Sequence, residues 1–323
     1  NNSYILSNSE AENLLNNYSQ VVCQKNINPQ IRSKINNKGH GGIGPKVVSL
    51  EMTHIFEQTE EMLSKYFKDS HVPSILVDYS VTEKTDGERQ FLFISNEGKG
   101  YLIDNLMNFR DINIHFLGLK NCILDGEYVT KSKHKENINH FLIFDCYFMN
   151  GTDVRDLPLY TPDKQIKLES RLDKVKEVAK EFRKIDKKNS KRVKIFSKEY
   201  KFGDINTPGK TIFKKCNDIW KSVHQEKYQY EIDGLIFTPI KSPVGGKFKK
   251  NDKFYSGRSW FELFKWKPSQ DNTIDFLVKI QQEDGQDKIG YRNVDGEIKK
   301  YKTLLLYIGD HTTNKNIDPY RSE

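Results

Sequence analysis

The chain has 323 residues, a formal net charge of +8 at pH 7, and 36% hydrophobic and 12% aromatic residues. This length is typical of two domains with full-sized cores, which argues against a disordered chain. A mean hydropathy of −0.73 and the lack of any apolar run near the ~20 residues of a membrane helix argue against a spanning protein. The 4 cysteines form no CxxC pair, which argues against a zinc ribbon and against a disulfide scaffold. The pattern is typical of a protein from a reducing compartment.

The first part of the chain is predicted to be a helix and a linker. Residues 7–22 place apolar side chains on one side of a helix, and a polar stretch, 25–38, follows. A glycine cluster before Pro45 lacks the Gly-Lys-Ser/Thr of a phosphate-binding loop and is typical of a flexible turn. We therefore set 1–45 apart. Because residue 1 is Asn rather than Met, the chain is expected to be a piece of a longer protein.

The middle of the chain predicts one α+β domain, 46–268. Residues 49–67 have the apolar spacing of an amphipathic helix that packs on a sheet. Two further helices are expected at 163–185 and 211–223. Short runs of β-type composition, separated by Gly, Asn and Asp turns and consistent with antiparallel pairing, lie at 74–80, 89–95, 100–104, 122–130, 141–148 and 192–196.

Beyond Pro268 the pattern changes to strands only. Asp-Gly pairs at 284–285 and 295–296 favour tight hairpin turns between them. The segment 269–323 is therefore predicted to be a small β-domain with strands at 275–281, 288–294 and 299–309.

One short motif indicates chemistry. The run Lys84-Thr85-Asp86-Gly87-Glu88-Arg89 lies between two β-type segments, and its Asp-Gly pair favours a turn that holds a lysine and an arginine close together. Four companions follow in order: LDGE at 124–127, Phe144-Asp145, EIDGLIF at 231–237 and KWKP at 265–268. Each has a simpler explanation by itself: Asp125 as a turn residue, Phe144 as part of a buried strand, and the lysines of 265–268 as an exposed strand face.

Together and in this order, the motifs resemble those of the covalent nucleotidyltransferase superfamily, which comprises mRNA guanylyltransferases, DNA ligases and RNA ligases. The DGLIF and KWKP runs are most similar to mRNA capping guanylyltransferases, especially the multifunctional capping enzymes of large cytoplasmic DNA viruses and related linear plasmids. The resemblance covers about 82–278. It implies an antiparallel-sheet nucleotidyltransferase domain of the ATP-grasp-like or DNA ligase-like type, followed by an OB-fold domain at 269–323 that is expected to be incomplete.

The resemblance also implies which residues act. Lys84 is the nucleophile that carries a covalent GMP, and Lys265 and Lys267 contact phosphate. A lysine attacks only as the neutral amine, so nearby cations would help, and alternation about Trp266 places Lys265 and Lys267 on one face of a strand. The other implied roles are a nucleotide contact for Arg89, a ribose or metal contact for Glu127, guanine stacking for Phe144, and a metal or phosphate-side role for Asp233.

The chain departs from the family pattern in two places, and one further position has a candidate residue. Where many members have Asp-Arg, this chain has Asp104-Asn105, and Arg110 is the nearest arginine. Lys198 is the candidate for a phosphate-binding lysine between the third and fourth motifs. The sixth motif of the family, near the end of the OB domain, is not visible before Glu323.

The implied function is an mRNA guanylyltransferase that takes GMP from GTP and transfers it to the 5′-diphosphate end of RNA. The implied cofactor is Mg²⁺ or Mn²⁺, held by Glu127 and Asp233, since such ions take oxygen ligands. The expected partners are GTP, RNA, and triphosphatase and methyltransferase domains of a larger capping enzyme, without a membrane. The expected location is the cytoplasm, that of the host or the virion if the protein is viral. The alternatives are an ATP-dependent DNA or RNA ligase and a non-catalytic nucleic-acid-binding module of the same fold.

Overall fold

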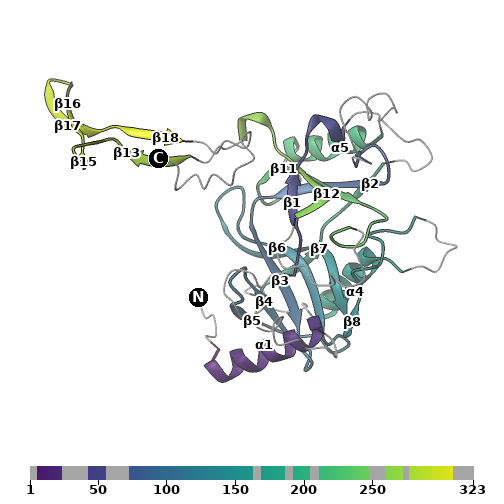
Figure 1. Ribbon diagram of the computed structural model, residues 1–323. Coiled ribbons are helices and arrows are strands. Elements are labelled where there is room, and N and C mark those ends of the chain that lie inside the picture. The colour runs from purple at the N-terminus through teal and green to yellow at the C-terminus, as the bar shows by residue number, and fades with distance from the viewer. Residues whose placement is uncertain are drawn as a thin grey trace. The chain divides into compact units, whose positions relative to one another are not determined.

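The computed structural model describes residues 6–23, 43–55, 73–162, 169–185, 192–203, 211–246, 259–271 and 276–307. The chain divides into two compact units, Asn1–Pro268 and Ser269–Glu323 (Figure 1). In the described ranges, no helix has the length and apolar character needed to cross a membrane.

Two sheets form the frame of the first unit. The smaller has the order β1-β12-β11-β2-β10, and the larger has the order β5-β4-β3-β6-β7-β8 with β9 beside β7. The smaller sheet consists of β1 (Lys46–Ser49), β12 (Ser259–Trp266), β11 (Ile232–Pro239), β2 (Tyr79–Thr85) and β10 (Lys201–Phe202). The larger consists of β5 (Phe109–His115), β4 (Lys99–Ile103), β3 (Glu88–Ile94), β6 (Cys122–Lys131), β7 (Asn137–Met149), β8 (Thr152–Asp153) and β9 (Lys194–Ser197).

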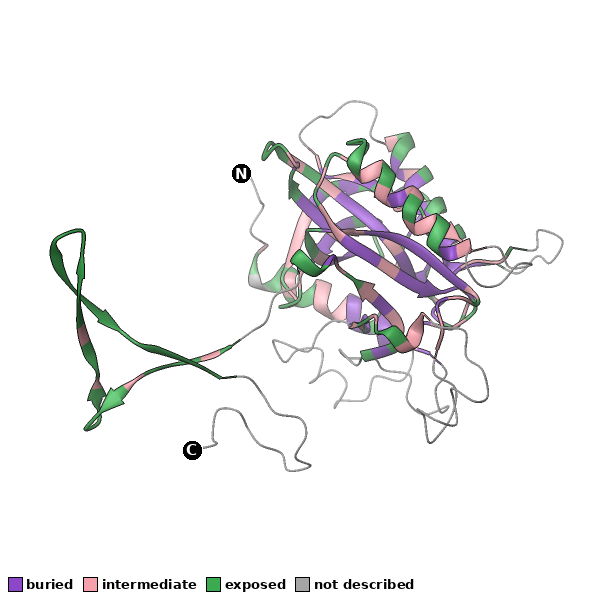
Figure 2. Cartoon of the chain, turned by 90° about the horizontal axis from the view of Figure 1, so that it is seen from above, coloured by how far each residue is buried: buried purple, intermediate pink, exposed green. Residues whose placement is uncertain are grey.

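The predicted α+β class with antiparallel sheets is confirmed. Within the described strands of this unit, all pairs are antiparallel except β1 with β12 and β7 with β9, which are parallel. Figure 2 shows that buried residues are concentrated along these strands.

The two faces of the smaller sheet have different surroundings. One face packs against α5 (Thr211–His224) through the buried side chains of Tyr79, Val81, Leu235, Phe237 and Phe264. Successive side chains on a strand point to opposite faces. The alternate residues of the same strands, such as Lys84 and Ile236, therefore belong to the other face. That face is directed to the cleft described below.

The larger sheet is covered on both faces. Leu92, Leu102 and Leu124 pack on one side with residues of α4 (Arg171–Ile185). On the other side, Phe93 packs against Tyr18 of α1 (Asn8–Cys23), with ring centroids 5.6 Å apart. The part of this second face that α1 leaves uncovered carries the residues of the cleft.

The N-terminal helix therefore belongs to the first unit. Setting all of 1–45 apart from the domain is wrong for α1, because Tyr18 is fully buried in the same core cluster as Phe91 and Phe93. The apolar stripe that predicts the helix is thus a core-packing face rather than the surface of a separate segment.

Two predicted helices begin differently in the structure. Ser49 ends β1, and only a 3-10 turn, η1 (Met52–His54), follows; the rest of the helix predicted at 49–67 lies outside the described residues. The helix predicted at 163–185 is α4, which starts at Arg171. The Ser170 hydroxyl donates to the Asp173 carboxylate at 2.7 Å and accepts from the Asp173 amide at 3.3 Å, which fixes this start.

The second unit shows three strand pairs among its described residues. They are β13 (Leu277–Ile280) with β18 (Leu304–Tyr307), β14 (Gln282–Glu283) with β15 (Gln286–Asp287), and β16 (Ile289–Val294) with β17 (Glu297–Lys302). Both predicted Asp-Gly turns have two residues with positive φ, 50° and 76° at 284–285 and 57° and 86° at 295–296, as hairpin turns of this kind require. The OB fold stays a prediction, because residues 276–307 do not form a closed barrel.

Candidate active site

The predicted Lys84–Arg89 motif connects the two sheets. Lys84 is on β2 of the smaller sheet, Arg89 is on β3 of the larger sheet, and the turn at residues 86–87 crosses between them. A Cβ at Gly87 would lie 2.8 Å from Cγ of Glu127, so only glycine permits this approach. The motif therefore holds its lysine and its arginine on two walls of one cleft.

The cleft lies between the two sheets and brings together five of the predicted site residues. Its lining includes Lys84, Arg89, Glu127, Phe144 and Lys198. The remaining polar and aromatic side chains around it are those of Thr82, Thr85, Asp125, Asp145, Tyr147, Tyr200, Thr238 and Trp260.

Asp233 joins two of the predicted lysines. Lys84 Nζ donates to both carboxylate oxygens of Asp233, at 2.8 and 2.9 Å, and Lys267 Nζ lies 2.7 Å from Oδ2. Partial burial opposes ionisation of Asp233, but the hydrogen bonds from Lys267 and Lys84 outweigh it, so the pKa of this carboxyl lies below its ordinary value. The carboxylate is therefore charged at neutral pH and holds two cations at the start of β11.

The strand after Asp233 places Lys265 by register. Ile236, a cleft residue, pairs with Lys265 of β12, so both side chains share the cleft face of the sheet. Trp266 points the other way and contacts Trp220 of α5, with ring centroids 5.6 Å apart. The alternation expected for 265–267 is present. Only glycine fits at position 234 beside this segment, because a Cβ there would overlap the Trp266 carbonyl oxygen.

Arg89 is fixed by a fully buried carboxylate. Its Nε and one terminal nitrogen donate to the two oxygens of Asp125 at 3.0 and 2.5 Å, and Tyr147 donates to the same carboxylate at 2.5 Å. The other terminal nitrogen donates to the Pro45 carbonyl at 2.8 Å. Burial opposes the charge of Arg89, but Asp125 more than compensates and raises its pKa. The interpretation of Asp125 as a turn residue is therefore wrong: it is the anchor of Arg89.

Phe144 faces the cleft instead of the core. A β-bulge between β6 and β7 leaves Phe144 without a partner on the neighbouring strand. The Arg89 guanidinium lies 5.9 Å from the centre of its ring, and the Phe144 carbonyl accepts a 2.9 Å hydrogen bond from Tyr200. The ring is thus held in place with a side exposed to the cleft, which fits a stacking role.

The pKa of Glu127 is unusually high for a carboxyl group. Burial raises its pKa to about 7, although Lys198 and Lys84 act in the opposite direction. In the described part of the chain, no group of three or more His, Cys, Asp or Glu side chains is arranged to hold a metal. Mg²⁺ accepts one or two carboxylates together with the phosphates of a nucleotide as its ligands. Glu127 fits that role better than Asp233, which already binds two lysines.

Lys198 lies in the wall of the cleft and is almost completely buried. Its Nζ donates to the Glu83 carbonyl at 2.6 Å and lies 3.4 Å from Oε1 of the same residue, with side-chain exposures of 4% and 3%. Tyr230 donates to Glu83 Oε1 at 3.4 Å. Glu83 directly precedes Lys84, so these contacts connect Lys198 to β2, the strand that carries the predicted nucleophile.

Arg110 does not belong to the cleft. It pairs with Leu102 across β4 and β5, which places it on the α4 face of the larger sheet. There its guanidinium lies 4.2 Å from the centre of the Tyr128 ring and donates to the Tyr128 hydroxyl at 3.1 Å. The proposed nucleotide contact of Arg110 is therefore wrong, because the sheet separates it from Arg89 and Glu127.

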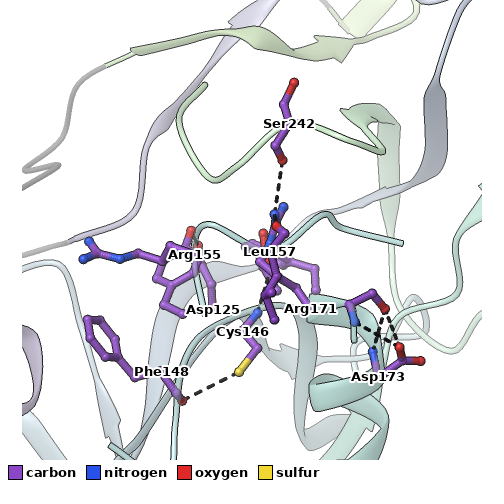
Figure 3. Close-up of polar contacts among 12 residues, drawn as sticks. Asp125, Cys146, Phe148, Arg155, Leu157, Arg171, Asp173 and Ser242 are labelled. Carbon is purple, nitrogen blue, oxygen red and sulfur yellow. Dashed lines mark hydrogen bonds and ion pairs between the residues drawn. The ribbon is translucent and has the colours of Figure 1, made fainter. Parts of the chain in front are cut away.

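Sequence reasoning missed a buried ion pair beside Phe144. Arg171 Nε donates to Asp145 Oδ1 at 2.7 Å. Another guanidinium nitrogen of Arg171 donates to the carbonyls of Leu157 and Ser242 (Figure 3). Burial raises the pKa of Asp145, and Arg171 counteracts that shift. In the sequence, the position of Asp145 directly after Phe144 was the one sign that Asp145 belongs to the site. No motif marks Arg171, the first residue of α4.

These observations define the class of the protein. A lysine, several fixed cations and an exposed aromatic ring converge on one cleft between two antiparallel sheets, as a nucleotidyltransferase domain requires. Residues 75–269 match the mRNA capping enzyme catalytic domain. The chain belongs to this family.

Several capping enzymes are similar to the chain. The probable mRNA-capping enzyme of Acanthamoeba polyphaga mimivirus is 30% identical over 268 residues, covering 72% of this chain and 22% of the relative. The mRNA-capping enzyme of Danio rerio is 29% identical over 249 residues, covering 72% and 34%. The alpha subunit of the enzyme from Saccharomyces cerevisiae is 29% identical over 238 residues, covering 66% and 46%. The chain therefore spans less than half the length of each of these three relatives.

Among solved structures, the mycobacterial DNA ligase D complexed with ATP and MES is similar at 13% identity and a TM-score of 0.38, covering 62% of this chain and 56% of that chain. A score of this size carries no functional argument.

Proposed function

We propose that this chain performs the guanylyltransferase step of mRNA capping. Lys84 Nζ attacks the α-phosphorus of GTP, a nitrogen–phosphorus bond forms, and the bond to the β-phosphate oxygen breaks so that pyrophosphate leaves. A terminal phosphate oxygen of 5′-diphosphate RNA then attacks the same phosphorus, and the nitrogen–phosphorus bond breaks. The products are GpppN-capped RNA and free Lys84.

The observation that carries this proposal is the position of Lys84 on the cleft, held by Asp233 together with Lys267. Attack requires that Lys84 leave this ion pair and lose a proton. The Asp233 carboxylate keeps Lys267 beside the reacting nitrogen, while Lys265 occupies the same face of the sheet. Fixed cations of this kind stabilise negative charge that develops on the phosphates during transfer.

The other cleft residues support a bound guanine nucleotide. Phe144 offers its ring for stacking on the base, beside the fixed guanidinium of Arg89. Lys198 also lines the cleft, where its ammonium group is paired with the Glu83 carboxylate. Bound Mg²⁺ or Mn²⁺ would neutralise charge on the phosphate oxygens, and Glu127 is the residue that would hold it. Since the pKa of Glu127 is about 7, binding of the cation would compete with a proton near neutral pH.

The proposed partners follow from the same step. GTP and the 5′-diphosphate end of RNA are the substrates, and the net charge of +8 suits a phosphate backbone. Triphosphatase and methyltransferase domains are proposed as parts of the parent capping enzyme. The similarity to the mimivirus protein supports a viral origin, and we propose the host cytoplasm or the virion as the location.

Covalent labelling tests the function. Incubation with α-³²P-labelled GTP and Mg²⁺ should leave label on the wild-type chain, and Lys84→Ala should leave none. Lys99→Ala, a change of an exposed lysine on β4, is the matched control and should label like the wild type. Labelling by ATP but not by GTP would assign the chain to the ligase chemistry instead, and label on the Lys84→Ala variant would exclude Lys84 as the nucleophile.

A further inference from the structure

A second groove adjoins the active-site cleft on the same unit. It is lined by residues of β7, β9 and β10, by the segment after α5, and by the buried pair of Glu83 and Lys198. Lys198 also lines the active-site cleft, so this lysine forms part of the wall of both. None of the implied roles of the site residues uses the rest of the groove.

Strand register connects the groove to the cleft. Arg89 on β3 pairs with Glu127 on β6, Glu127 pairs with Leu142 on β7, and Leu142 pairs with Phe196 on β9. Directly paired residues share one face of a sheet, so the four side chains form a row. The row begins in the cleft and ends in the groove. At ~4.8 Å per strand, Phe196 lies ~10 Å from Glu127 along the sheet.

The groove presents aromatic rings to solvent. Phe196 on β9 is 44% exposed, so part of its ring is open to solvent. His140 packs against it edge-on, with ring centroids 5.0 Å apart. Burial and then Lys194 lower the pKa of His140, so its ring is neutral at pH 7. From the segment after α5, the half-buried Tyr228 and Tyr230 also line the groove and form a second ring pair, with centroids 5.9 Å apart.

The charges of the groove favour a phosphate chain. Lys201 and Lys227 join Lys198 in the lining, and the carboxylates that face them are Glu83 and Glu199. Lys198 neutralises Glu83 through the contacts described above, which leaves Lys201 and Lys227 against one glutamate. Rings with accessible faces beside lysines are the combination that binds single-stranded nucleic acid, because bases stack on the rings while the cations follow the backbone.

We propose that this groove binds the first nucleotides of the acceptor RNA as a single strand, with bases stacked on Phe196 and Tyr228 and the 5′ phosphates directed past Lys198 into the cleft. The assignment of the 5′ end rests on the proposed guanylyltransferase function. A duplex would not expose its base faces to these rings, so the ligand is unpaired RNA.

The test separates RNA binding from the chemistry at Lys84. The double variant Phe196→Ala/Tyr228→Ala and the charge variant Lys201→Glu/Lys227→Glu are compared with the wild type as full chains. Phe213→Ala, which removes a ring of similar exposure on α5, and Lys120→Glu, at an exposed position between strands, are the matched controls. Circular dichroism melts confirm that each variant folds. Fluorescence anisotropy measures binding of a labelled, unstructured 5′-diphosphate RNA, and labelled GTP measures formation of lysyl-GMP.

We expect the aromatic double variant to bind the RNA about fivefold more weakly or worse, since loss of one stacked base costs at least this factor. The charge variant should weaken binding and flatten its salt dependence. Both should form lysyl-GMP like the wild type and transfer GMP to RNA with a raised KM for RNA. Both controls should bind RNA normally.

Unchanged RNA binding in the aromatic double variant would overturn the groove assignment. If that variant at the same time lost binding of a fluorescent poly-glutamate peptide, the groove would be a protein site instead. The proposed function fails in a different way. If the wild type forms no lysyl-GMP but the groove variants still lose RNA affinity, the groove stands and the guanylyltransferase assignment falls.

Discussion

Asp233 binds Lys84 through both carboxylate oxygens and at the same time holds Lys267 at 2.7 Å. Lys84 is on β2 and Lys267 directly follows the end of β12, and these two strands lie on either side of β11. A single carboxylate therefore fixes the proposed nucleophile and a proposed phosphate-binding cation in one geometry.

Replacing Asp233 by Asn should slow the formation of lysyl-GMP about tenfold or more, because Lys84 and Lys267 would lose the carboxylate that holds both of them in one geometry. The rate is measured with labelled GTP at saturating Mg²⁺. Asp78→Asn, which removes an ion pair between more exposed side chains, Asp78 and Lys241, should leave the rate unchanged. A wild-type rate for the Asp233→Asn variant would show that the carboxylate does not organise the site.

Glu127→Gln should stabilise the fold at alkaline pH while reducing activity. Burial raises the folded-state pKa of Glu127 to about 7 from an ordinary 4.5, so the folded chain holds this proton more tightly than the unfolded chain. The wild type then loses stability as pH rises from the unfolded pKa to the folded one, and the loss is complete above about pH 7.

Urea unfolding at a series of pH values checks this. Relative to the wild type, Glu127→Gln should show equal stability below about pH 4.5 and a gain of about 3 kcal/mol above pH 7.5. Glu136→Gln, a change of an exposed glutamate, should follow the wild type at all pH values. A stability gain that does not depend on pH would contradict the raised pKa.

Arg171→Met should destabilise the first unit by about 3–5 kcal/mol, because it leaves the buried carboxylate of Asp145 without its partner. Guanidinium denaturation followed by tryptophan fluorescence measures the loss. The double variant Arg171→Met/Asp145→Leu should recover part of it, since no unpaired charge remains. If Arg171→Met alone unfolds like the wild type, the ion pair is not a determinant of stability.

Phe144→Ala should raise the KM for GTP about fivefold or more, because it removes the ring on which the base is proposed to stack. Phe144→Tyr keeps a ring and should restore most of the affinity. The KM is determined from the GTP dependence of lysyl-GMP formation. An unchanged KM for Phe144→Ala would place the base elsewhere in the cleft.

Much of the local structure follows from short-range rules. The turn at residues 86–87 and the hairpins at 284–285 and 295–296 are visible as Asp-Gly pairs, and alternation alone places Lys265 and Lys267 on one face. These features depend on neighbours in the sequence, which is why they can be inferred without the fold.

Other predictions required information that no local pattern contains. Arg110 lies close to the predicted motif in the sequence but on the opposite face of the sheet, because its side is set by its pairing with Leu102. Asp125 looks like a turn residue, yet folding buries it against Arg89. In both cases the partner across the strands decides the role.

By itself the sequence determined the α+β class, the order of the motifs, and the residue types available for nucleotide chemistry. Only the tertiary structure decided that the Asp233 carboxylate holds Lys84, that Asp145 is paired with Arg171, and that the cleft continues along one row of side chains to Phe196. The physical reason is that side-chain alternation along a strand is local, whereas tertiary packing joins residues far apart in the sequence, from 26 positions for Asp145 and Arg171 to 149 for Lys84 and Asp233.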